Sequence, residues 1–592
     1  MQSTHELLTR WPALDVTAKR ARLQNSLQLS PGTLAATLRS AVAPAERAAA
    51  ALWSGDGSAW TSDPAAQQDI ARWMGWMRSP ALMAESLDRL LTFAERVKRD
   101  GITDVVLLGM GGSSLAPEVL HSVLGVAPGW PRFHMLDSTD PAAIRAAATT
   151  PATTLYLLSS KSGTTIEPNS LAAHFRQRLQ DARMSRWADH FVAITDEGTA
   201  LARRAHEEEF RDVFINPSDI GGRYSALSFF GMVPAALMGQ DVGAIIGWGL
   251  AMLASSHPGA ASAPENPAAG LGLVMGEGAR TGRDKMTLVV PGALDAFGLW
   301  VEQLIAESTG KNGTGVVPIA GEPLADPAAY GSDRLFVRVR AYDAVDEAER
   351  EAAMSGLKAL QVPIAEIAVP TRDALGAEFV RWEIATAVAG AILRINPFDQ
   401  PNVQKAKDAT NTLLAEYTAK GQLPAAAADA TLDNGIALTL TTAARAQLRD
   451  AGAEAILTLI RAGDYFALLA YLGPDPALAR ALQTLRREVR DRTRAATMFA
   501  YGPRYLHSTG QLHKGGPNTG VFVIVSATPR EDLPIPDSTF SFGTLEHAQA
   551  LGDLASLDAA GRRGVLVHLP SPDPALVREM SDALLARVPG SG

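Results

Sequence analysis

Short runs of apolar, β-branched residues alternate with longer helical patterns from about residue 103 onward. Five runs are candidate strands: TDVVLLG (103–109), RFHML (132–136), TLYLL (154–158), HFVAIT (190–195) and VFIN (213–216). Because parallel strands need helical crossovers and are buried on both faces, this alternation predicts a doubly wound α/β sheet. The apolar stretch VGAIIGWGLAMLA from Val242 is shorter than the about 20 residues that span a bilayer, so we interpret it as a core helix.

The same patterns divide the chain into four parts. The first 80 residues are rich in Ala and Arg and helical in character, whereas two Ala/Pro-rich stretches, 255–270 and 423–435, have the composition of linkers. We therefore expect a helical N-terminal segment (1–80) and three α/β domains (81–256, 270–422 and 434–592). The length of 592 residues fits several domains of about 100–200 residues each.

Two stretches of the chain also resemble each other. IAESTGKNGTGVVPI (305–319) and YLHSTGQLHKGGPNTGVFVIV (505–525) both join S-T-G to a glycine-rich turn and a strand. Similar strand and helix patterns follow in the same order, so we interpret the two regions as a degenerate repeat in which the third domain resembles the second. This interpretation predicts that Glu307 and His507 occupy equivalent places in the two domains.

Composition narrows the classes of function. The net charge is −9 and the basic residues are scattered, which argues against nucleic-acid and membrane partners. The absence of cysteine removes disulfides, thiolate nucleophiles and Cys-type zinc sites, and with no signal peptide at the N-terminus it favours the cytoplasm. The histidines fall in no metal-ligand spacing, so we expect no metal and no other cofactor.

A hydroxyl-rich turn follows the third predicted strand. Residues 158–168 read LSSKSGTTIEP, in which Pro168 suits the first turn of a helix. Hydroxyls and free backbone N–H groups at a helix N-terminus can bind a phosphate without a large net positive charge. Simple helix capping would need one or two hydroxyls, whereas residues 159–165 supply five. The candidate ligands in this turn are Ser160, Lys161, Ser162 and Thr165.

A second strand–turn–helix junction lies upstream, in DVVLLGMGGSSLAPEVL (104–120). Its glycines allow a ligand to approach the backbone closely, and Gly112 and Ser113 are the candidate contacts. The spacing matches neither the dinucleotide motif nor the nucleoside triphosphate motif. We expect both loops to lie on one rim of the sheet, where open α/β sheets bind their ligands.

Both loops resemble the sugar-phosphate isomerase (SIS) fold, and further segments narrow the resemblance to the glucose-6-phosphate isomerase family. The segments that carry it, in that family's order, are GMGGSSLAP, SSKSGTT, GGRYSALSFFGMVPA, WVEQLIAESTGK and INPFDQPNVQKAK. The resemblance covers about 100–410 and extends through YLHSTGQ into the third domain. It is closest to the isomerase part of bacterial chains in which transaldolase is fused in front, although no transaldolase-like barrel pattern precedes the isomerase segments here.

This resemblance implies an aldose–ketose isomerase of glycolysis and gluconeogenesis that interconverts glucose 6-phosphate and fructose 6-phosphate through an enediol. It also implies a homodimer and a functional link to transaldolase. Glu307, in the Q-x-x-x-E-S-x-G-K segment, would carry the proton between two carbons, with Gln303 facing the same ligand one helical turn earlier. Arg223, in the G-G-R segment, would stabilise the developing enediolate.

The substrate is mainly a closed ring, so a second acid/base must first open it, and histidine titrates in the useful range. The resemblance gives this role to His507 in HSTGQ, with Lys407 after F-D-Q assisting and Gln400 contacting the substrate. In the family the histidine segment precedes F-D-Q, whereas here it follows, so His507 could serve its own chain or a dimer partner. His513 is the alternative histidine.

Two other hypotheses fit parts of the sequence. A non-catalytic SIS module that senses a sugar phosphate would keep the SSKSGTT loop, but it has no use for Glu307, Arg223 and Lys407 together. A phosphoglucose/phosphomannose isomerase or an amino-sugar isomerase would share the phosphate loop, but the two segments around Glu307 and Lys407 argue against both.

Overall fold

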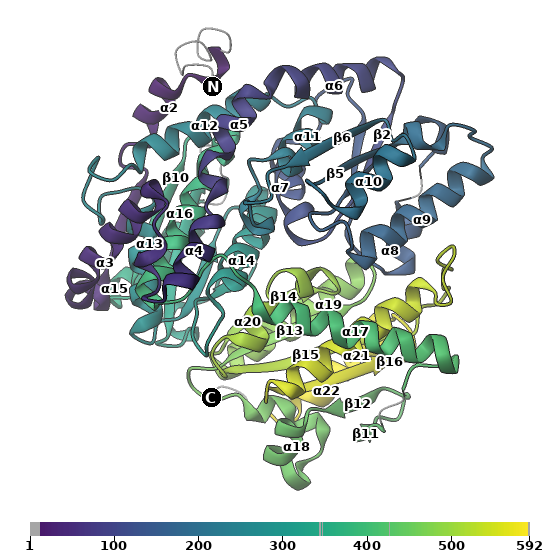
Figure 1. Ribbon diagram of the computed structural model, residues 1–592. Helices are drawn as coiled ribbons and strands as arrows, with labels where there is room; N and C mark the ends of the chain where they lie inside the picture. Colours follow the sequence, from purple (N-terminus) through teal and green to yellow (C-terminus); the bar gives the residue numbers. More distant parts are fainter. Residues whose placement is uncertain (1–11, 148, 342–344, 346, 425–426, 590–592) are drawn as a thin grey trace.

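The computed structural model describes residues 12–147, 149–341, 345, 347–424 and 427–589. The start of the chain, where no signal peptide was expected, lies outside these residues. Three β-sheets organise the described chain, each surrounded by helices (Figure 1). The predicted α/β class with parallel sheets is therefore confirmed.

The first sheet contains the five strands predicted from the sequence. They pair in parallel in the order β3-β2-β4-β5-β6. Their bounds are β2 (Asp104–Leu108), β3 (Arg132–Leu136), β4 (Thr154–Ser159), β5 (Phe191–Asp196) and β6 (Asp212–Asn216). Val105 and Leu107 join one hydrophobic cluster, whereas Val106 and Leu108 join another. Because successive side chains of a strand point to opposite faces, the sheet is buried on both sides.

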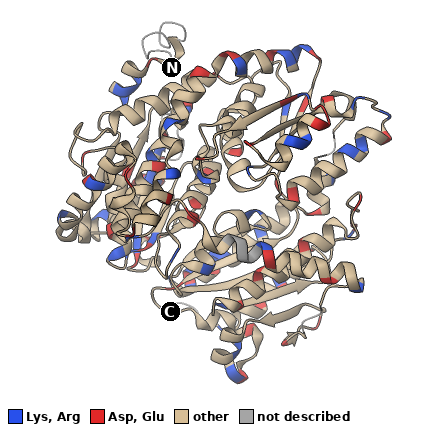
Figure 2. Cartoon of the chain, in the orientation of Figure 1, with Lys and Arg blue, Asp and Glu red and all other residues tan. Residues whose placement is uncertain are grey.

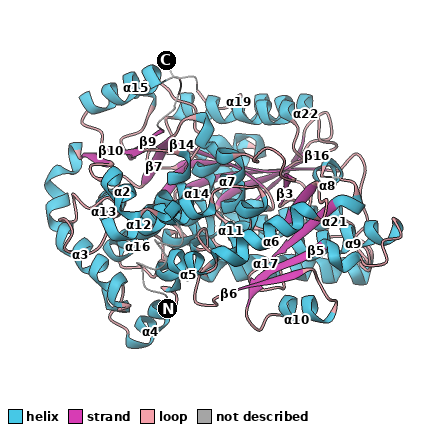
Figure 3. Cartoon of the chain, turned by 90° about the horizontal axis from the view of Figure 1, so that it is seen from above, coloured by secondary structure: helices cyan, strands magenta, loops and turns pink. Residues whose placement is uncertain are grey.

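Helices cover both faces of this sheet, as the view from above shows (Figure 3). They are α6 (Leu87–Arg99), α7 (Leu115–Leu124), α8 (Pro141–Ala146), α9 (Ile166–Asp181), α10 (Ala200–Glu207) and α11 (Phe229–Leu237). The next helix, α12 (Val242–Ser255), packs mainly against helices of the N-terminal segment and the second domain. Helix α12 is the apolar stretch from Val242, and its residues are mostly buried, which confirms the core-helix interpretation. None of the helices in the described part of the chain is long and apolar enough to cross a membrane.

The second sheet has the order β1-β10-β9-β7-β8. Its strands are β1 (Leu27–Ser30), β7 (Lys285–Val289), β8 (Val317–Ile319), β9 (Arg334–Ala341) and β10 (Ile364–Val369). Its helices are α13 (Ala269–Arg280), α14 (Asp295–Thr309), α15 (Glu347–Ala359) and α16 (Leu375–Leu393).

The N-terminal segment was predicted to be helical, and most of it is. It contains α2 (Val16–Leu23), α3 (Ala35–Ser54), α4 (Pro64–Arg72) and α5 (Ser79–Glu85). However, β1 lies between α2 and α3 and pairs antiparallel with β10. The segment therefore completes the second sheet, because β1 covers the exposed edge of β10.

The third sheet has the order β11-β12-β16-β15-β13-β14. Its strands are β11 (Ala430–Thr431), β12 (Ala437–Leu440), β13 (Tyr465–Tyr471), β14 (Ala496–Tyr501), β15 (Gly520–Ala527) and β16 (Arg563–Leu569). The helices of this part of the chain are α17 (Pro401–Lys420), α18 (Thr442–Leu448), α19 (Pro476–Thr493), α20 (Gly510–Gly515), α21 (Phe542–Ala559) and α22 (Pro574–Leu585). Helix α17 precedes the second predicted linker but packs against α21 of the third domain.

The second and third sheets share a strand order. The parallel strands follow β10-β9-β7-β8 in one and β16-β15-β13-β14 in the other, and an antiparallel strand flanks each at the same end. The third domain thus resembles the second, as the repeat predicted. The predicted equivalence of Glu307 and His507 is wrong, because Glu307 lies between the first and second parallel strands, whereas His507 lies between the second and third.

Buried charges join the second and third domains. Arg334 Nη1 donates to Glu322 Oε2 (2.8 Å), and Glu322 Oε1 accepts from the backbone N–H of Thr497 (2.8 Å). From the third domain, Arg486 donates to the carbonyls of Ala320 and Gly321, both at 2.8 Å. Elsewhere, positive and negative residues are interspersed along the chain (Figure 2). The interface therefore contains a hydrogen-bonded ionic network rather than a purely apolar seam.

The third domain also packs against the first. Phe542, Leu545 and Ala548 of α21 belong to the same hydrophobic cluster as Leu158 of β4 and Phe175 of α9. This packing brings the third domain to the carboxyl end of the first sheet, where ligands of open α/β sheets bind.

Candidate active site

The hydroxyl-rich turn connects β4 to the N-terminus of α9. Ser160 Oγ donates to Thr165 Oγ1 (3.2 Å) and accepts from the backbone N–H of Gly163 (3.2 Å). Thr165 is the N-cap residue of α9, but its side chain makes no capping hydrogen bond. Because this hydroxyl does not satisfy the free N–H groups of the helix, the turn remains suited to an external anion.

Lys161 lies in the same turn, but its side chain is directed elsewhere. Its ammonium forms an ion pair with Asp196 and lies 5.2 Å from the ring centroid of Trp73. Burial raises the pKa of Asp196 to about 6, and the neighbouring Lys161 opposes that rise. The structure therefore does not bring the Lys161 side chain to the other predicted ligands of this turn.

The glycine loop after β2 permits three segments to meet backbone to backbone. A Cβ on Gly112 would lie 2.1 Å from the carbonyl oxygen of Gly222, and one on Gly111 would lie 2.7 Å from that of His507. Ser113 is buried, and its carbonyl accepts from Ser159 Oγ (3.1 Å), which links the two loops of the first sheet. These contacts explain why glycine is needed at 111 and 112.

Arg223 is buried and directs its guanidinium at the ends of two helices. It donates to Ser308 Oγ on α14 (2.6 Å) and to Gln400 Oε1 at the N-cap of α17 (2.9 Å). It also donates to the carbonyls of Pro397 (2.7 Å) and Asp399 (2.9 Å). These bonds fix the guanidinium as a positive charge in a buried site.

Glu307 lies in the last turn of α14, beside this guanidinium. Its Oε1 is 3.3 Å from Arg223 Nη1, and its side chain is only 12% exposed. Burial raises the pKa of Glu307, while the charges of Arg223, Lys311 and His507 oppose the rise. A carboxyl group with a raised pKa is suited to accept and return a proton near neutral pH.

Gln303 joins Glu307 to the third domain. Its Nε2 donates to the carbonyl of His507 (2.7 Å) and lies 3.4 Å from Glu307 Oε2. Its Oε1 is buried and has no hydrogen-bond partner among the described residues. Since a buried amide oxygen without a partner is unfavourable, this atom is available to a ligand.

His507 is the last residue of the 3₁₀ turn Arg504–His507 in the third domain. Its Nε2 lies 2.9 Å from Oε1 of Glu167, in the first turn of α9. Burial would raise the pKa of Glu167, but the charge and hydrogen bond of His507 lower it below its ordinary value, as does the charge of Lys407. The contact between His507 and the first domain is made within one chain.

His513, the alternative histidine, lies in the core. It is 1% exposed and packs against the rings of Tyr465, Tyr505 and Phe522. Neither ring nitrogen has a hydrogen-bond partner among the described residues, and burial lowers the pKa of His513 well below its ordinary value. This environment suits a neutral, structural histidine rather than an acid/base group.

A cavity of about 330 Å³ lies between the first domain, α17 and the third domain. Its lining residues are Ser162, Thr164, Thr165, Ile166, Glu167, Lys407, Thr410, Asn411, Leu506, His507 and Gln549. The structure thus brings two residues of the predicted phosphate turn together with Lys407 and His507. Glu167 and Gln549 were not predicted: an acid in a first helical turn resembles an ordinary helix-capping charge, and no motif surrounds Gln549.

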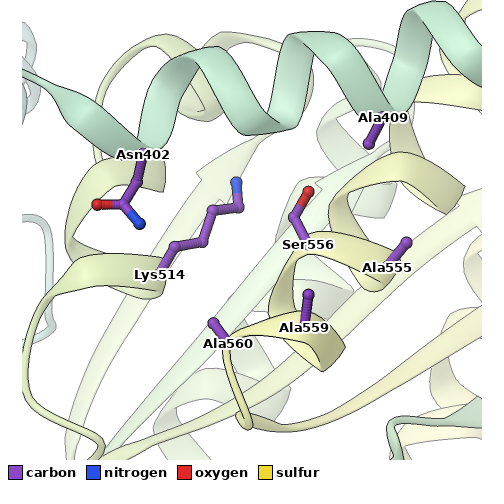
Figure 4. Close-up of a pocket in the computed structure, with 7 residues that line it drawn as sticks. All are labelled: Asn402, Ala409, Lys514, Ala555, Ser556, Ala559 and Ala560. Carbon is purple, nitrogen blue, oxygen red and sulfur yellow. The ribbon is translucent and has the colours of Figure 1, made fainter.

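A second cavity, of about 370 Å³, has a different character. Figure 4 shows Lys514 directed into it between Asn402 of α17 and Ser556 of α21, and the other lining residues are alanines. Lys514 forms an ion pair with the buried Asp553 (2.7 Å), so its charge is already neutralised. Helical periodicity puts Lys407 and Asn411 on one face of α17 and Asn402 and Ala409 on another, so the two cavities flank the same helix.

Comparisons with known proteins agree with this geometry. The phosphoglucose isomerase family model matches residues 81–316. The glucose-6-phosphate isomerase of Rubrobacter xylanophilus is 30% identical over 381 residues, which cover 57% of this chain and 88% of that protein. The enzyme of the same name from Parasynechococcus marenigrum is 28% identical over 466 residues, or 69% and 81% of the two chains. The family match spans the 159–165 turn, Arg223 and Glu307.

Among solved structures, a hypothetical protein from Thermus thermophilus is similar to this chain. The TM-score is 0.55 and the sequence identity is 25%, over 66% of this chain and 100% of that one.

Proposed function

This chain belongs to the glucose-6-phosphate isomerase family, and from that premise we propose how its residues divide the reaction. The reaction interconverts glucose 6-phosphate and fructose 6-phosphate through an enediol. The contact that most supports a single site is made by Gln303, whose amide reaches both Glu307 and the backbone of His507. The Gln303 side chain therefore connects Glu307, the candidate for proton transfer between carbons, with His507, the candidate for ring opening.

The substrate phosphate binds at the 159–165 turn. The hydroxyls of Ser162, Thr164 and Thr165 line the cavity at the N-terminus of α9, where the helix dipole favours an anion. Lys407 lies across the same cavity and adds one positive charge. Hydrogen bonds to a phosphate dianion are stronger than neutral ones, so these few groups suffice.

His507 opens the ring. His507 Nε2 donates a hydrogen bond to the carboxylate of Glu167, which leaves Nδ1 as the nitrogen that faces the substrate. During opening, the ring oxygen gains a proton and the hydroxyl on the anomeric carbon loses one, so a group that can both give and accept a proton is suitable.

Glu307 then moves the proton between the two carbons. Its carboxylate takes the proton from carbon 2 of the open aldose and returns one to carbon 1, while the hydroxyl proton on the oxygen of carbon 2 is lost and the oxygen of carbon 1 gains a proton. Arg223, held by five hydrogen-bonding or ionic contacts, supplies fixed positive charge to the enediolate. We assign Gln303 and Gln400 to contacts with the sugar hydroxyls; the Oε1 of Gln303, which has no hydrogen-bond partner among the described residues, supports this role.

A coupled assay tests this proposal directly. Fructose 6-phosphate is supplied, and formation of glucose 6-phosphate is followed by its oxidation with a dehydrogenase. We expect turnover without added metal. No turnover by the folded, full-length chain would contradict the proposal, and parallel measurement with mannose 6-phosphate would define its substrate range.

Removing the hydroxyls of the turn should mainly weaken substrate binding. We expect the Ser162→Ala, Thr164→Ala, Thr165→Ala triple variant to raise KM by about tenfold or more, with a smaller change in kcat, since charge-assisted hydrogen bonds are lost. Steady-state kinetics and inhibition by inorganic phosphate measure the effect. Asp573→Ala, which removes the N-cap of α22, is the control for simple loss of a helix cap. An unchanged KM in the triple variant would show that the turn only caps α9.

The site uses residues of one chain, so activity should not depend on exchange between chains. We expect a mixture of Glu307→Gln and His507→Ala chains to remain as inactive as each variant alone. Specific activity of the unmodified chain should also stay constant on dilution. Recovery of activity in the mixture would show that His507 serves a partner's site, as a homodimer of the family type would require.

A further inference from the structure

Gln549 connects the third domain to two separate segments of the first. It lies on α21, is 2% exposed, and lines the cavity of about 330 Å³. Its Nε2 donates to Glu167 Oε1 (2.7 Å), and its Oε1 accepts from Thr139 Oγ1 (2.9 Å). Both ends of the amide are thus used.

Hydrogen-bonding rules fix the orientation of this amide. An ionised carboxylate only accepts, so the NH₂ end of Gln549 must face Glu167, and the carbonyl end faces the hydroxyl of Thr139. The reverse orientation would direct an amide oxygen at a carboxylate oxygen. Thr139 itself is fully buried, so a water molecule cannot replace Gln549 as the hydrogen-bond partner of its hydroxyl.

The same carboxylate oxygen receives two donors. Glu167 Oε1 lies 2.7 Å from Gln549 Nε2 and 2.9 Å from His507 Nε2. A second donor favours the ionised form of Glu167 and limits rotation of its side chain. An ionised and fixed Glu167 in turn requires that Nε2 of His507 carry a proton.

We propose that Gln549, itself held by Thr139, is a positioning residue for ring opening, which fixes Glu167 against His507 so that the imidazole presents Nδ1 to the sugar. This inference rests on the role proposed above for His507. The third domain then supplies two groups for ring opening: His507, the acid/base group, and Gln549, the side chain that orients the carboxylate of Glu167. No part of it requires contact between Gln549 and the reacting atoms.

Substitutions at Gln549 should affect ring opening selectively. We expect Gln549→Met, which keeps the volume and removes both hydrogen bonds, to lower kcat on glucose 6-phosphate by about tenfold or more. The acid limb of this variant's pH–activity profile on glucose 6-phosphate should move to higher pH, because Glu167 loses a hydrogen-bond donor that favours its ionised form. Turnover of 5-deoxyfructose 6-phosphate, a 5-deoxy analogue with no hydroxyl that can close a ring onto its carbonyl, should change little. Steady-state kinetics across pH with both substrates measure these effects.

Gln549→Glu gives a readout that a purely structural role would not change. At neutral pH the introduced carboxylate repels Glu167, so ring opening should be slow. As pH falls, the introduced group gains an O–H that can donate to Glu167, and relative activity against Gln549→Met should rise. Thr139→Val should produce a weaker form of the Gln549→Met defect, and Thr139→Ser should restore activity by keeping the hydroxyl.

Controls separate this inference from the proposed function. Thr154→Val removes a buried hydroxyl from the start of β4 and should leave both kcat and the pH profile unchanged. If His507→Ala slows the cyclic substrate but Gln549→Met, Gln549→Glu and Thr139→Val all retain the unmodified pH profile and kcat, the role of Gln549 is wrong. If His507→Ala also has no effect, the proposed ring-opening role itself fails.

Discussion

Replacing Glu307 by glutamine should lower kcat by about 10³-fold or more, because the amide keeps the shape of the carboxyl group but cannot accept a carbon-bound proton. The substitution leaves the 159–165 turn intact, so inhibition by inorganic phosphate should be nearly unchanged. The coupled assay measures kcat, and phosphate inhibition reports the binding site separately. Turnover close to that of the unmodified chain would remove Glu307 from the reaction.

The same helix offers a matched control for this prediction. Glu302 is buried on α14, where burial raises its pKa to about 8, so it is mostly protonated at neutral pH. Glu302→Gln therefore replaces a neutral acid by a neutral amide of similar shape and should preserve turnover. Because Glu307 must be ionised to take a proton and its pKa is also raised by burial, activity should fall as pH drops through that raised pKa.

Replacing His507 by alanine should lower turnover of cyclic glucose 6-phosphate by about 10²-fold or more. Turnover of the 5-deoxy analogue should stay closer to normal, because ring opening and carbon–proton transfer use separate acid/base groups. Glu307→Gln should impair both substrates. Comparing the two variants on the two substrates therefore assigns one step to each residue.

His513 provides the control for His507. His513→Phe should keep activity, since the histidine already packs among aromatic rings and makes no hydrogen bond within the described structure. Circular dichroism and thermal unfolding would verify that this variant remains folded. The opposite pattern, with ring opening lost in the folded His513 variant and retained in His507→Ala, would show that the acid/base histidine was assigned wrongly.

Local patterns predicted much of the fold. The five strands of the first sheet were predicted because each combines a short apolar run with a turn and a helical stretch. The strand β1 was missed, since LQLS is too short to differ from a loop and becomes a strand through pairing with β10. The S-T-G repeat detected related domains but misaligned them, because the same three letters occur in connections of different topological position.

The candidate site shows a similar division between local and distant information. Arg223 and Glu307 each lie in a segment that matches a family motif at several positions. The sequence could therefore indicate that the two side chains meet. Lys161 was expected to face the ligand, but Asp196, which lies on the adjacent strand, attracts its ammonium. Glu167 and Gln549 depend on packing between the first and third domains, for which the chain carries no local signal.

The buried contacts between the second and third sheets have a consequence for folding cooperativity. Arg486 of α19 donates to two carbonyls of the second domain, and Glu322 of that domain accepts from Thr497 in the third. Separating the two domains would remove these hydrogen bonds to charged groups, which contribute about 1.5–3 kcal/mol each. The third domain is therefore poorly suited to be gained or lost as an independent module, and the position of His507 is coupled to the stability of the domain that carries Glu307.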